Sequence, residues 1–328
     1  MSIVILPHLG TSIPPYLADC VHQIRLWNKD TCIFIILDPI HKGVHFWNDL
    51  RSNYDVIYQY TDSLEPTVAH RLFLSSYKCD RTFRQGYWQY VVERFFYVEE
   101  LMRSLDLSHC LMLEYDVLIY TDLTTLTEKF KTSHQTCRVV CDNKMRCYPS
   151  FIYAPNADEM GKLNTFIQAN VLSGLNDMEL LAKYGNETQQ SLHYLPVITE
   201  VRNKSMSPRT SLVGHIDHNP YYLSEDSEHF GVLFDSLVVG QYLGGVDPRN
   251  AGGHKSGCYM NETALYSMQE MTFRWEHDNA LWRPIIDNRP LAMIHLHCKS
   301  LKSFLSDRPT VPTDDYAAAD ILSGLVKN

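Results

Sequence analysis

Residues Leu111–Tyr120 read LMLEYDVLIY, an apolar run of strand-forming residues that holds two carboxylates one residue apart. Side chains alternate across an extended strand, so we expect Glu114 and Asp116 to leave it on the same side, with Cα atoms roughly 7 Å apart. Two such carboxylates at the carboxyl end of a buried strand suit a hard divalent cation with oxygen ligands. The alternative is a strand that ends in a solvated acidic turn, which an acid-x-acid pattern alone favours.

The segments on either side of this stretch predict an α/β sheet. Ile3–Leu6 and Cys32–Leu37 are short apolar runs typical of buried strands, and apolar residues at helical spacing lie between them. A β-α-β order favours parallel strands joined by a right-handed crossover. Further along, Trp88–Leu105 carries an amphipathic helical pattern and Leu291–Leu296 reads as a late strand. We therefore expect a mixed, mostly parallel sheet flanked by helices.

Three residues follow the first two predicted strands directly. Ligands of parallel sheets bind beyond the carboxyl ends of the strands, so His8, Gly10 and Asp38 are expected to meet a nucleotide base or ribose. Asp38 precedes a proline, and an ordinary turn is an equally good interpretation of that pair.

Length and charge narrow the class of protein. The 328 residues are enough for one large α/β domain or two lobes. The net charge of −9, without a long basic run, argues against nucleic acid as a partner. No apolar run approaches the ~20 residues of a membrane helix, and the opening segment lacks the regions of a signal peptide. Nine cysteines without a CxxC pair favour a reducing compartment, so we expect a cytoplasmic protein.

Taken together, the sequence resembles the GT-A class of nucleotide-sugar-dependent glycosyltransferases. The resemblance covers roughly residues 1–305 and rests on four features: the β-α-β unit ending at Asp38, the helix with Glu93-Arg94, the segment Leu111–Tyr120, and His297-Cys298-Lys299. The third is similar to the metal-binding Asp-x-Asp segment of the family, although Glu114 stands where Asp is commonest. The fourth is similar to the histidine and lysine that close the metal and diphosphate site in many members.

The resemblance implies a GT-A (Rossmann-like) fold, with two abutting lobes in one large domain. Residues 1–122 would bind the nucleotide-sugar, residues 123–305 would bind the acceptor and carry catalysis, and residues 306–328 would form a C-terminal tail.

The resemblance also implies a metal site and a phosphate site. Mn²⁺ or Mg²⁺ would be held by Glu114, Asp116 and His297, because neutral imidazole suits Mn²⁺. His295 and His297 alternate on one strand, so both being structural histidines is the alternative. The residues that would bind the donor are those at the strand ends, the basic side chains that would meet the phosphates, and one metal ligand: His8, Gly10, Asp38, Arg94, Lys299, Lys302 and Glu114.

An inverting enzyme would need a carboxylate base near the acceptor hydroxyl. The candidates are Asp235, an acid within an apolar stretch, and then Glu262 and Asp142. Burial would raise the pKa of Asp235 towards a useful value. The alternative is that Asp235 caps a helix over Phe234–Tyr242.

The expected activity is transfer of a sugar from a UDP- or GDP-sugar to a hydroxyl of a glycan or glycoprotein acceptor. A sugar-phosphate nucleotidyltransferase is one alternative, but the loop after the first strand, HLGTS at residues 8–12, has no Arg or Lys for a triphosphate. A non-catalytic carbohydrate-binding protein of the same fold is the other.

Overall fold

The computed structural model describes residues 1–78, 83–188, 191–206, 209–247 and 261–308. Its main feature is a seven-stranded sheet with the order β3-β2-β1-β4-β7-β6-β8. The strands are β1 (Ile3–His8), β2 (Cys32–Leu37), β3 (Val56–Tyr60), β4 (Cys110–Leu113), β6 (Cys137–Asn143), β7 (Arg146–Ala154) and β8 (Leu192–Tyr194).

Strand directions confirm the predicted sheet class. β1 runs parallel to β2 and β4, β2 runs parallel to β3, and β6 runs parallel to β8. Only β7 is antiparallel to its neighbours, β4 and β6. The carboxyl ends of β1, β2 and β4 therefore meet at one edge, with the first residues of β7 beside them.

A second sheet is built mostly from the last third of the chain. It contains β5 (Val117–Ile119), β11 (Leu233–Phe234), β12 (Phe273–Asp278), β13 (Leu281–Ile286) and β14 (Arg289–His295). β14 pairs with β11, β13 and β5. A two-stranded ribbon of β9 (Arg209–Thr210) and β10 (Ile216–Asp217) stands apart from both sheets.

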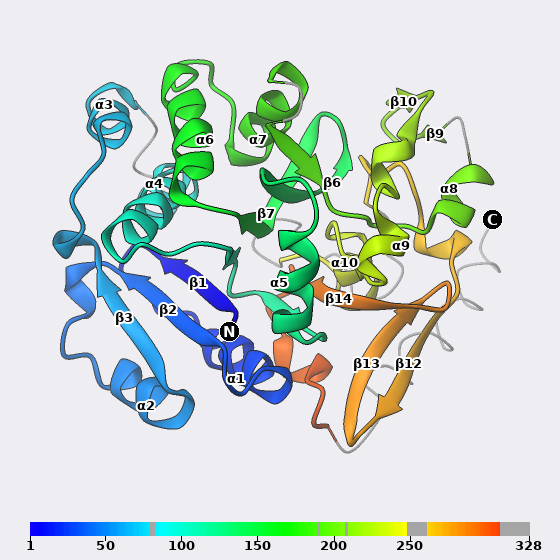
Figure 1. Ribbon diagram of the computed structural model, residues 1–328, viewed down its shortest axis with the longest axis horizontal. Helices are drawn as coiled ribbons and strands as arrows, with labels where there is room; N and C mark the ends of the chain where they lie inside the picture. Colours follow the sequence, from blue (N-terminus) through cyan, green and yellow to red (C-terminus); the bar gives the residue numbers. More distant parts are fainter. Residues whose placement is uncertain (79–82, 189–190, 207–208, 248–260, 309–328) are drawn as a thin grey trace.

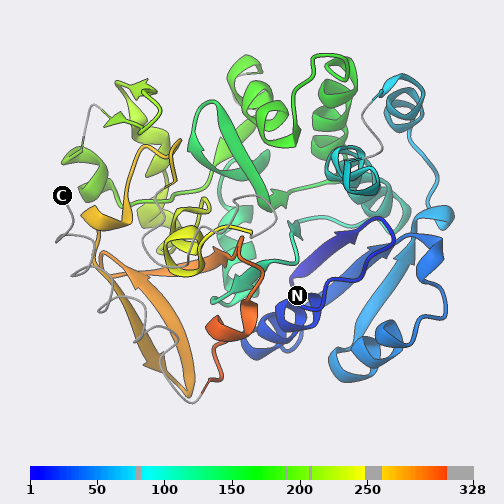
Figure 2. The same cartoon turned by 180° about the vertical axis from the view of Figure 1, so that it is seen from behind.

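Helices cover both faces of the large sheet. In Figure 1, α3, α4, α6 and α7 lie above its strands, whereas α1 and α2 lie below them. The same layers appear from behind in Figure 2. The helices are α1 (Leu17–Trp27), α2 (His45–Tyr54), α3 (Val68–Ser76), α4 (Tyr87–Ser104), α5 (Leu123–Lys131), α6 (Ala157–Ala169), α7 (Asp177–Glu187), α8 (Glu200–Lys204), α9 (Ser227–Phe230) and α10 (Val238–Gly244). Among the residues the structure describes, no helix is both long and apolar enough to span a membrane.

Several of these elements match the segments predicted from the sequence. The helix expected over Trp88–Leu105 is α4, displaced by one residue at each end, and the strand expected over Leu291–Leu296 overlaps β14. The tail expected at residues 306–328 lies outside the described residues from 309 onward.

The central stretch departs from its prediction in one respect. Leu111–Tyr120 is not one extended strand but β4 and β5 joined by a turn, in which Val117 N–H donates to the Glu114 carbonyl over 3.3 Å. The chain must change direction here because β4 belongs to the large sheet and β5 pairs with β14 in the second. Glu114 and Asp116 thus lie in the turn that connects the two sheets.

A buried histidine on α3 lies between two carboxylates of α4. His70 Nδ1 lies 2.8 Å from a Glu100 carboxylate oxygen, and Nε2 lies 3.4 Å from Glu93. Burial alone would lower the pKa of His70, but the two carboxylates raise it to about 9. Because the pKa of His70 is higher in the folded than in the unfolded state, its protonated form stabilises the fold. This stabilisation is fully present below pH 6.5, the unfolded pKa, and is lost as the pH rises through about 9.

We therefore expect the free energy of unfolding to fall by at most about 3 kcal/mol between pH 6.5 and 9. Urea denaturation across this range measures it. The variant His70→Gln keeps a hydrogen-bonding side chain but carries no charge, so its pH profile should be flatter. The exposed His45→Gln is the control. Equal slopes for the wild type and His70→Gln would contradict this account.

Candidate active site

Two carboxylates and an imidazole meet between the two sheets. Glu114, Asp116 and His295 each direct one potential ligand atom into a group whose atoms all lie within 4.8 Å of one another. His295 Nε2 is 3.3 Å from Asp116 Oδ2 and 3.5 Å from Glu114 Oε2. Asp116 and His295 are buried, and Glu114 is partly exposed. The group therefore opens to solvent on the side of Glu114.

Strand pairing brings these residues together across about half of the chain. β14 is antiparallel to β5, with His295 opposite Val117, and Leu296 N–H donates to the Asp116 carbonyl over 2.8 Å. On the other side, Glu114 N–H donates to the Ser150 carbonyl over 3.1 Å. Main-chain hydrogen bonds from both sheets thus fix the acidic turn, which preorganises its side chains.

Lys299 approaches the same carboxylates. Its ammonium contacts Asp116 Oδ2, and its backbone is left-handed with φ of +64°. That conformation is costly for a residue with a β-carbon. Burial opposes ionisation of Asp116, but Lys299 and His295 hold the pKa of Asp116 well below its usual value. Burial likewise works against a charged His295, yet Asp116 and Glu114 raise the pKa of that imidazole.

The donor set fits a divalent cation. Two carboxylates and one imidazole are a common ligand set for Mn²⁺, and the carboxylates also suit Mg²⁺. The Lys299 ammonium already lies against Asp116, so this position favours positive charge. Glu114, Asp116 and His295 are the residues that would hold the ion.

Arg94 is hydrogen-bonded to one carboxylate of this group. Its guanidinium donates to Glu114 Oε1 at 2.6 Å and to Asp177 Oδ2 at 2.8 Å. Burial alone would lower the pKa of Arg94, but the coulombic attraction of Glu114 and Asp177 raises it above its usual value. Its side chain is 10% exposed and both donor ends are engaged. Arg94 therefore positions Glu114 in this structure.

Asp177 is a site residue that the sequence analysis missed. It is the first residue of α7, whose start is marked by the capping box between Asn176 and Glu179. Burial raises the pKa of Asp177 to about 6, against the opposing effect of Arg94. The capping box could have located the start of the helix, but no sequence signal shows that the start faces Arg94.

The two late histidines have different surroundings. His295 belongs to the carboxylate group, whereas His297 Nδ1 accepts a hydrogen bond from Asp247 N–H over 3.1 Å. Burial, with Lys299 and His295 nearby, lowers the pKa of His297 to about 4. The ring centroids of the two histidines are 6.4 Å apart. A ligand role for His297 stays a prediction, and His295 is the histidine that the geometry adds.

The residues expected to bind a base or ribose gather at the ends of β1 and β2. Asp38 Oδ2 accepts from Gly10 N–H at 2.6 Å, and the Gly10 carbonyl lies 2.7 Å from His41 Nε2. His8 is buried among aromatic rings, 5.4 Å from both Trp47 and Tyr115 between ring centroids. Burial, together with His41, lowers the pKa of His8 to about 4. A neutral imidazole therefore stands at the end of β1.

Aromatic side chains connect this region to the carboxylates. Tyr115, between the two acids, lies 5.4 Å from His8 and 5.9 Å from Tyr16 between ring centroids. Lys299 Nζ lies 5.9 Å from the centre of the Tyr16 ring. Lys302 is exposed in the short 3₁₀ turn Leu301–Phe304.

The first candidate base, Asp235, has the surroundings of a helix cap. Its two carboxylate oxygens accept from Val239 N–H at 2.8 Å, Gly240 N–H at 2.9 Å and His295 N–H at 3.0 Å. It is fully buried, and burial raises its pKa to about 6. Asp235 thus accepts hydrogen bonds from the first turn of α10, although that helix begins at Val238, not at Phe234, and its N-cap position is Leu237. Asp235 also fixes the backbone of His295.

The other two candidates differ in exposure. Glu262 is exposed. Asp142 is fully buried and accepts hydrogen bonds from Tyr148 at 2.9 Å, Thr263 at 2.7 Å and Arg146 at 2.8 Å. The ring of Tyr148 lies 6.5 Å from that of His295. Asp142 is thus one side chain away from the carboxylate group.

No family model matches the chain, and no curated protein matches it by sequence. The fold is similar to that of a mouse xyloside xylosyltransferase, at 10% identity and a TM-score of 0.43, over 60% of this chain and 84% of that chain. It is similar to galactosyltransferase LgtC with donor and acceptor sugar analogues, at 12% identity and a TM-score of 0.41, over 63% and 78% of the two chains.

A cytidylyltransferase from Leptospira borgpetersenii is also similar, at 7% identity and a TM-score of 0.36, over 60% of this chain and 75% of that chain. All three TM-scores are below 0.5. The residues of the site must therefore carry any functional assignment.

Proposed function

We propose that the protein is a metal-dependent glycosyltransferase that uses a nucleoside-diphosphate sugar as its donor. The observation that supports this most is the group of Glu114, Asp116 and His295 at the edge where β1, β2 and β4 end. Parallel α/β sheets bind nucleotides at that edge. A cation site with a lysine and an arginine beside it is the chemistry that a diphosphate leaving group requires.

The bound cation would act as a Lewis acid on the departing diphosphate. Asp116 and His295 would hold it from opposite sheets, and Glu114 would help directly or through water. The Lys299 ammonium, which now contacts Asp116, would turn to a phosphate oxygen once a divalent cation neutralises that carboxylate. Lys302, exposed a few residues later, would add charge at the mouth of the site.

On the other side of the site, the nucleoside would lie over the ends of β1 and β2. Asp38 and the Gly10 backbone would face the ribose, and the neutral His8 imidazole would lie near the base. Asp177, which pairs with Arg94, would accept hydrogen bonds from hydroxyls of the donor sugar. In this assignment residues 1–122 bind the nucleotide and residues 123–305 complete the site.

The acceptor would be a hydroxyl of a glycan or glycoprotein. Three carboxylates are candidates for the base that would deprotonate this hydroxyl. Asp142 has the network nearest to His295, whereas Asp235 is engaged by three backbone N–H groups and Glu262 is exposed. A retaining mechanism would need none of them as a strong base.

A panel of nucleotide-sugars tests the proposal. We expect the protein to release UDP or GDP from at least one UDP- or GDP-sugar in the presence of Mn²⁺ or Mg²⁺, and EDTA to suppress the release. In a thermal-shift panel of UDP, GDP and CMP, UDP or GDP should raise the melting temperature in a manner that depends on Mn²⁺.

Three results would contradict the proposal. Release that is insensitive to EDTA would argue against the metal. Pyrophosphate formed from a nucleoside triphosphate and a sugar phosphate would indicate a nucleotidyltransferase. Sugar binding without any turnover or metal dependence would indicate a carbohydrate-binding protein.

A further inference from the structure

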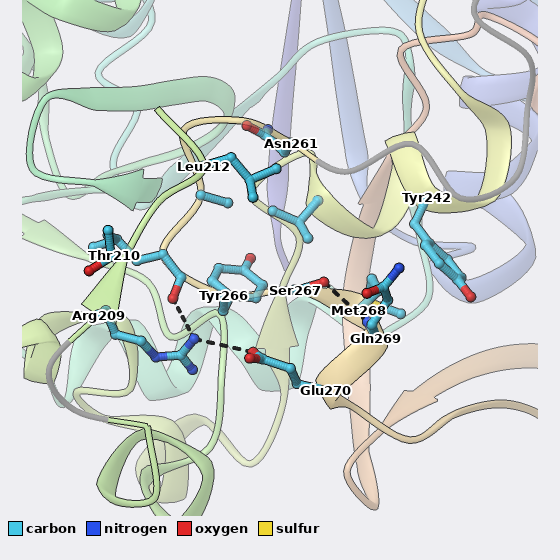
Figure 3. A pocket seen from close by; sticks show the side chains of 13 residues that line it. Arg209, Thr210, Leu212, Tyr242, Asn261, Tyr266, Ser267, Met268, Gln269 and Glu270 are labelled. Carbon is cyan, nitrogen blue, oxygen red and sulfur yellow. Dashed lines mark hydrogen bonds and ion pairs between the residues drawn. The ribbon is translucent and has the colours of Figure 1, made fainter. Parts of the chain in front are cut away.

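A pocket of about 300 Å³ lies beside α10, on the side of that helix away from β14. Val238 and Tyr242, one helical turn apart, line the pocket, whereas the space above Gly240 and Gly244 is filled by His295 and Cys298. α10 therefore separates the pocket from the strand that carries His295. The other walls come from β9 and from residues 261–270. Figure 3 shows Arg209 and Tyr242 on opposite sides of it, with Tyr266 between them.

Two series of contacts link the pocket wall to the carboxylate group. In the first, Asn261 donates to the Tyr148 hydroxyl over 3.3 Å, and the Tyr148 ring lies 6.5 Å from the His295 ring. In the second, the Tyr266 hydroxyl lies 2.6 Å from Ser236 Oγ. Ser236 follows Asp235, which holds the backbone of His295. Helix α10 and these side chains thus lie between the pocket and the candidate metal ligands.

The charges of the pocket cancel. Arg209 and Glu270 are its only charged lining residues among those described, and they pair at 3.3 Å. Arg209 Nη1 also donates to the Leu265 carbonyl, while Arg209 Nε, on a side chain that is 7% exposed, has no hydrogen-bond partner among the described residues. A pocket without net charge does not favour a diphosphate. It favours a neutral ligand with several hydroxyls.

The remaining lining suits one sugar ring. Tyr242, Met268 and Val238 offer apolar surface for the C–H face of a pyranose, and the Gln269 amide and the Thr210 hydroxyl offer hydrogen bonds to its rim. Ligand pockets range from roughly 300 to 1,000 Å³, so this one, at the small end, has room for a single ring. We infer that this pocket binds a neutral monosaccharide unit of the acceptor, an inference that rests on the proposed transferase function.

Direct binding tests the pocket without knowledge of the acceptor. The probes are the methyl glycosides of glucose, galactose, mannose and xylose, observed by saturation-transfer NMR on the full chain. We expect at least one probe to bind, to remain bound in the presence of saturating UDP and Mn²⁺, and to lose its signal in the double variant Tyr242→Ala/Gln269→Ala. Gln269 is exposed and Tyr242 only half-buried, so folding should survive, which thermal denaturation verifies. Gln168→Ala, on α6, is the matched control.

Kinetics gives a second readout. With an acceptor found by screening, Gln269→Ala should raise the acceptor KM roughly tenfold with little change in kcat, as expected when binding common to substrate and transition state is removed. Binding of no probe, binding that survives the double variant, or displacement of the probe by UDP would each overturn the inference. Failure of the wild type to cleave any nucleotide-sugar would count against the proposed function instead, and the binding result would still decide the pocket.

Discussion

Replacing Asp116 by asparagine is expected to lower metal-stimulated cleavage of the donor at least about 100-fold. Asp116 contributes an oxygen to the group with Glu114 and His295, and an amide of the same shape is a much weaker ligand for a hard cation. The same substitution should abolish binding of Mn²⁺ by isothermal titration calorimetry. The two readouts separate loss of the metal from loss of the chemistry.

Asp49→Asn is the control for this change, because Asp49 is an exposed acid on α2 whose carboxylate lies 3.6 Å from His45. His295→Ala and His297→Ala extend the test to the two histidines. A loss of Mn²⁺ affinity confined to His295→Ala would support the ligand that the geometry suggests, and a loss confined to His297→Ala would support the one that the sequence suggests. Full metal-stimulated activity in Asp116→Asn would remove the basis of the proposed function.

Replacing Asp235 by alanine is expected to destabilise the fold by about 4 kcal/mol, because three buried backbone N–H groups would lose their acceptor and each costs about 1–3 kcal/mol. These donors belong to Val239, Gly240 and His295. The loss of stability should appear in urea denaturation with an unchanged m-value.

Asp235→Asn distinguishes the two roles considered for this residue. It keeps the size of the side chain and one acceptor oxygen, so a capping role predicts a smaller loss of stability and measurable activity. A catalytic base predicts the reverse, a nearly normal stability with activity lost. The exposed Asp30→Ala controls for the removal of an acidic group. An Asp235→Ala protein as stable as the wild type would contradict the capping role.

The mostly parallel class of the large sheet and the convergence of Glu114 and Asp116 can both be predicted from the sequence. Apolar runs such as Cys32–Leu37 are buried on both faces of a parallel sheet, so their composition alone identifies them. Glu114 and Asp116 interrupt such a run, and their convergence was predicted, although through a strand rather than the turn between β4 and β5.

The partners of that acidic centre could not be predicted in the same way. Asp177 reaches Arg94 only because α7 begins beside α4, a contact between residues 83 positions apart. His295 and His297 are two residues apart and would share a face of one extended strand, so only the end of β14 at His295 and its pairing with β5 give them different surroundings. Periodicity within one segment carries no information about the register between two segments.

The pairing of β14 with β5 has a consequence for biosynthesis. The acidic turn is synthesised when little more than a third of the chain has been made, whereas His295 is added 179 residues after Asp116. Until then the N-terminal sheet can fold, but Asp116 would lack His295 and Lys299, and the β5 edge would be unpaired. Catalytic competence should therefore be among the last properties the nascent chain acquires, and an incomplete chain that ends before β14 should be inert even where its first sheet is native.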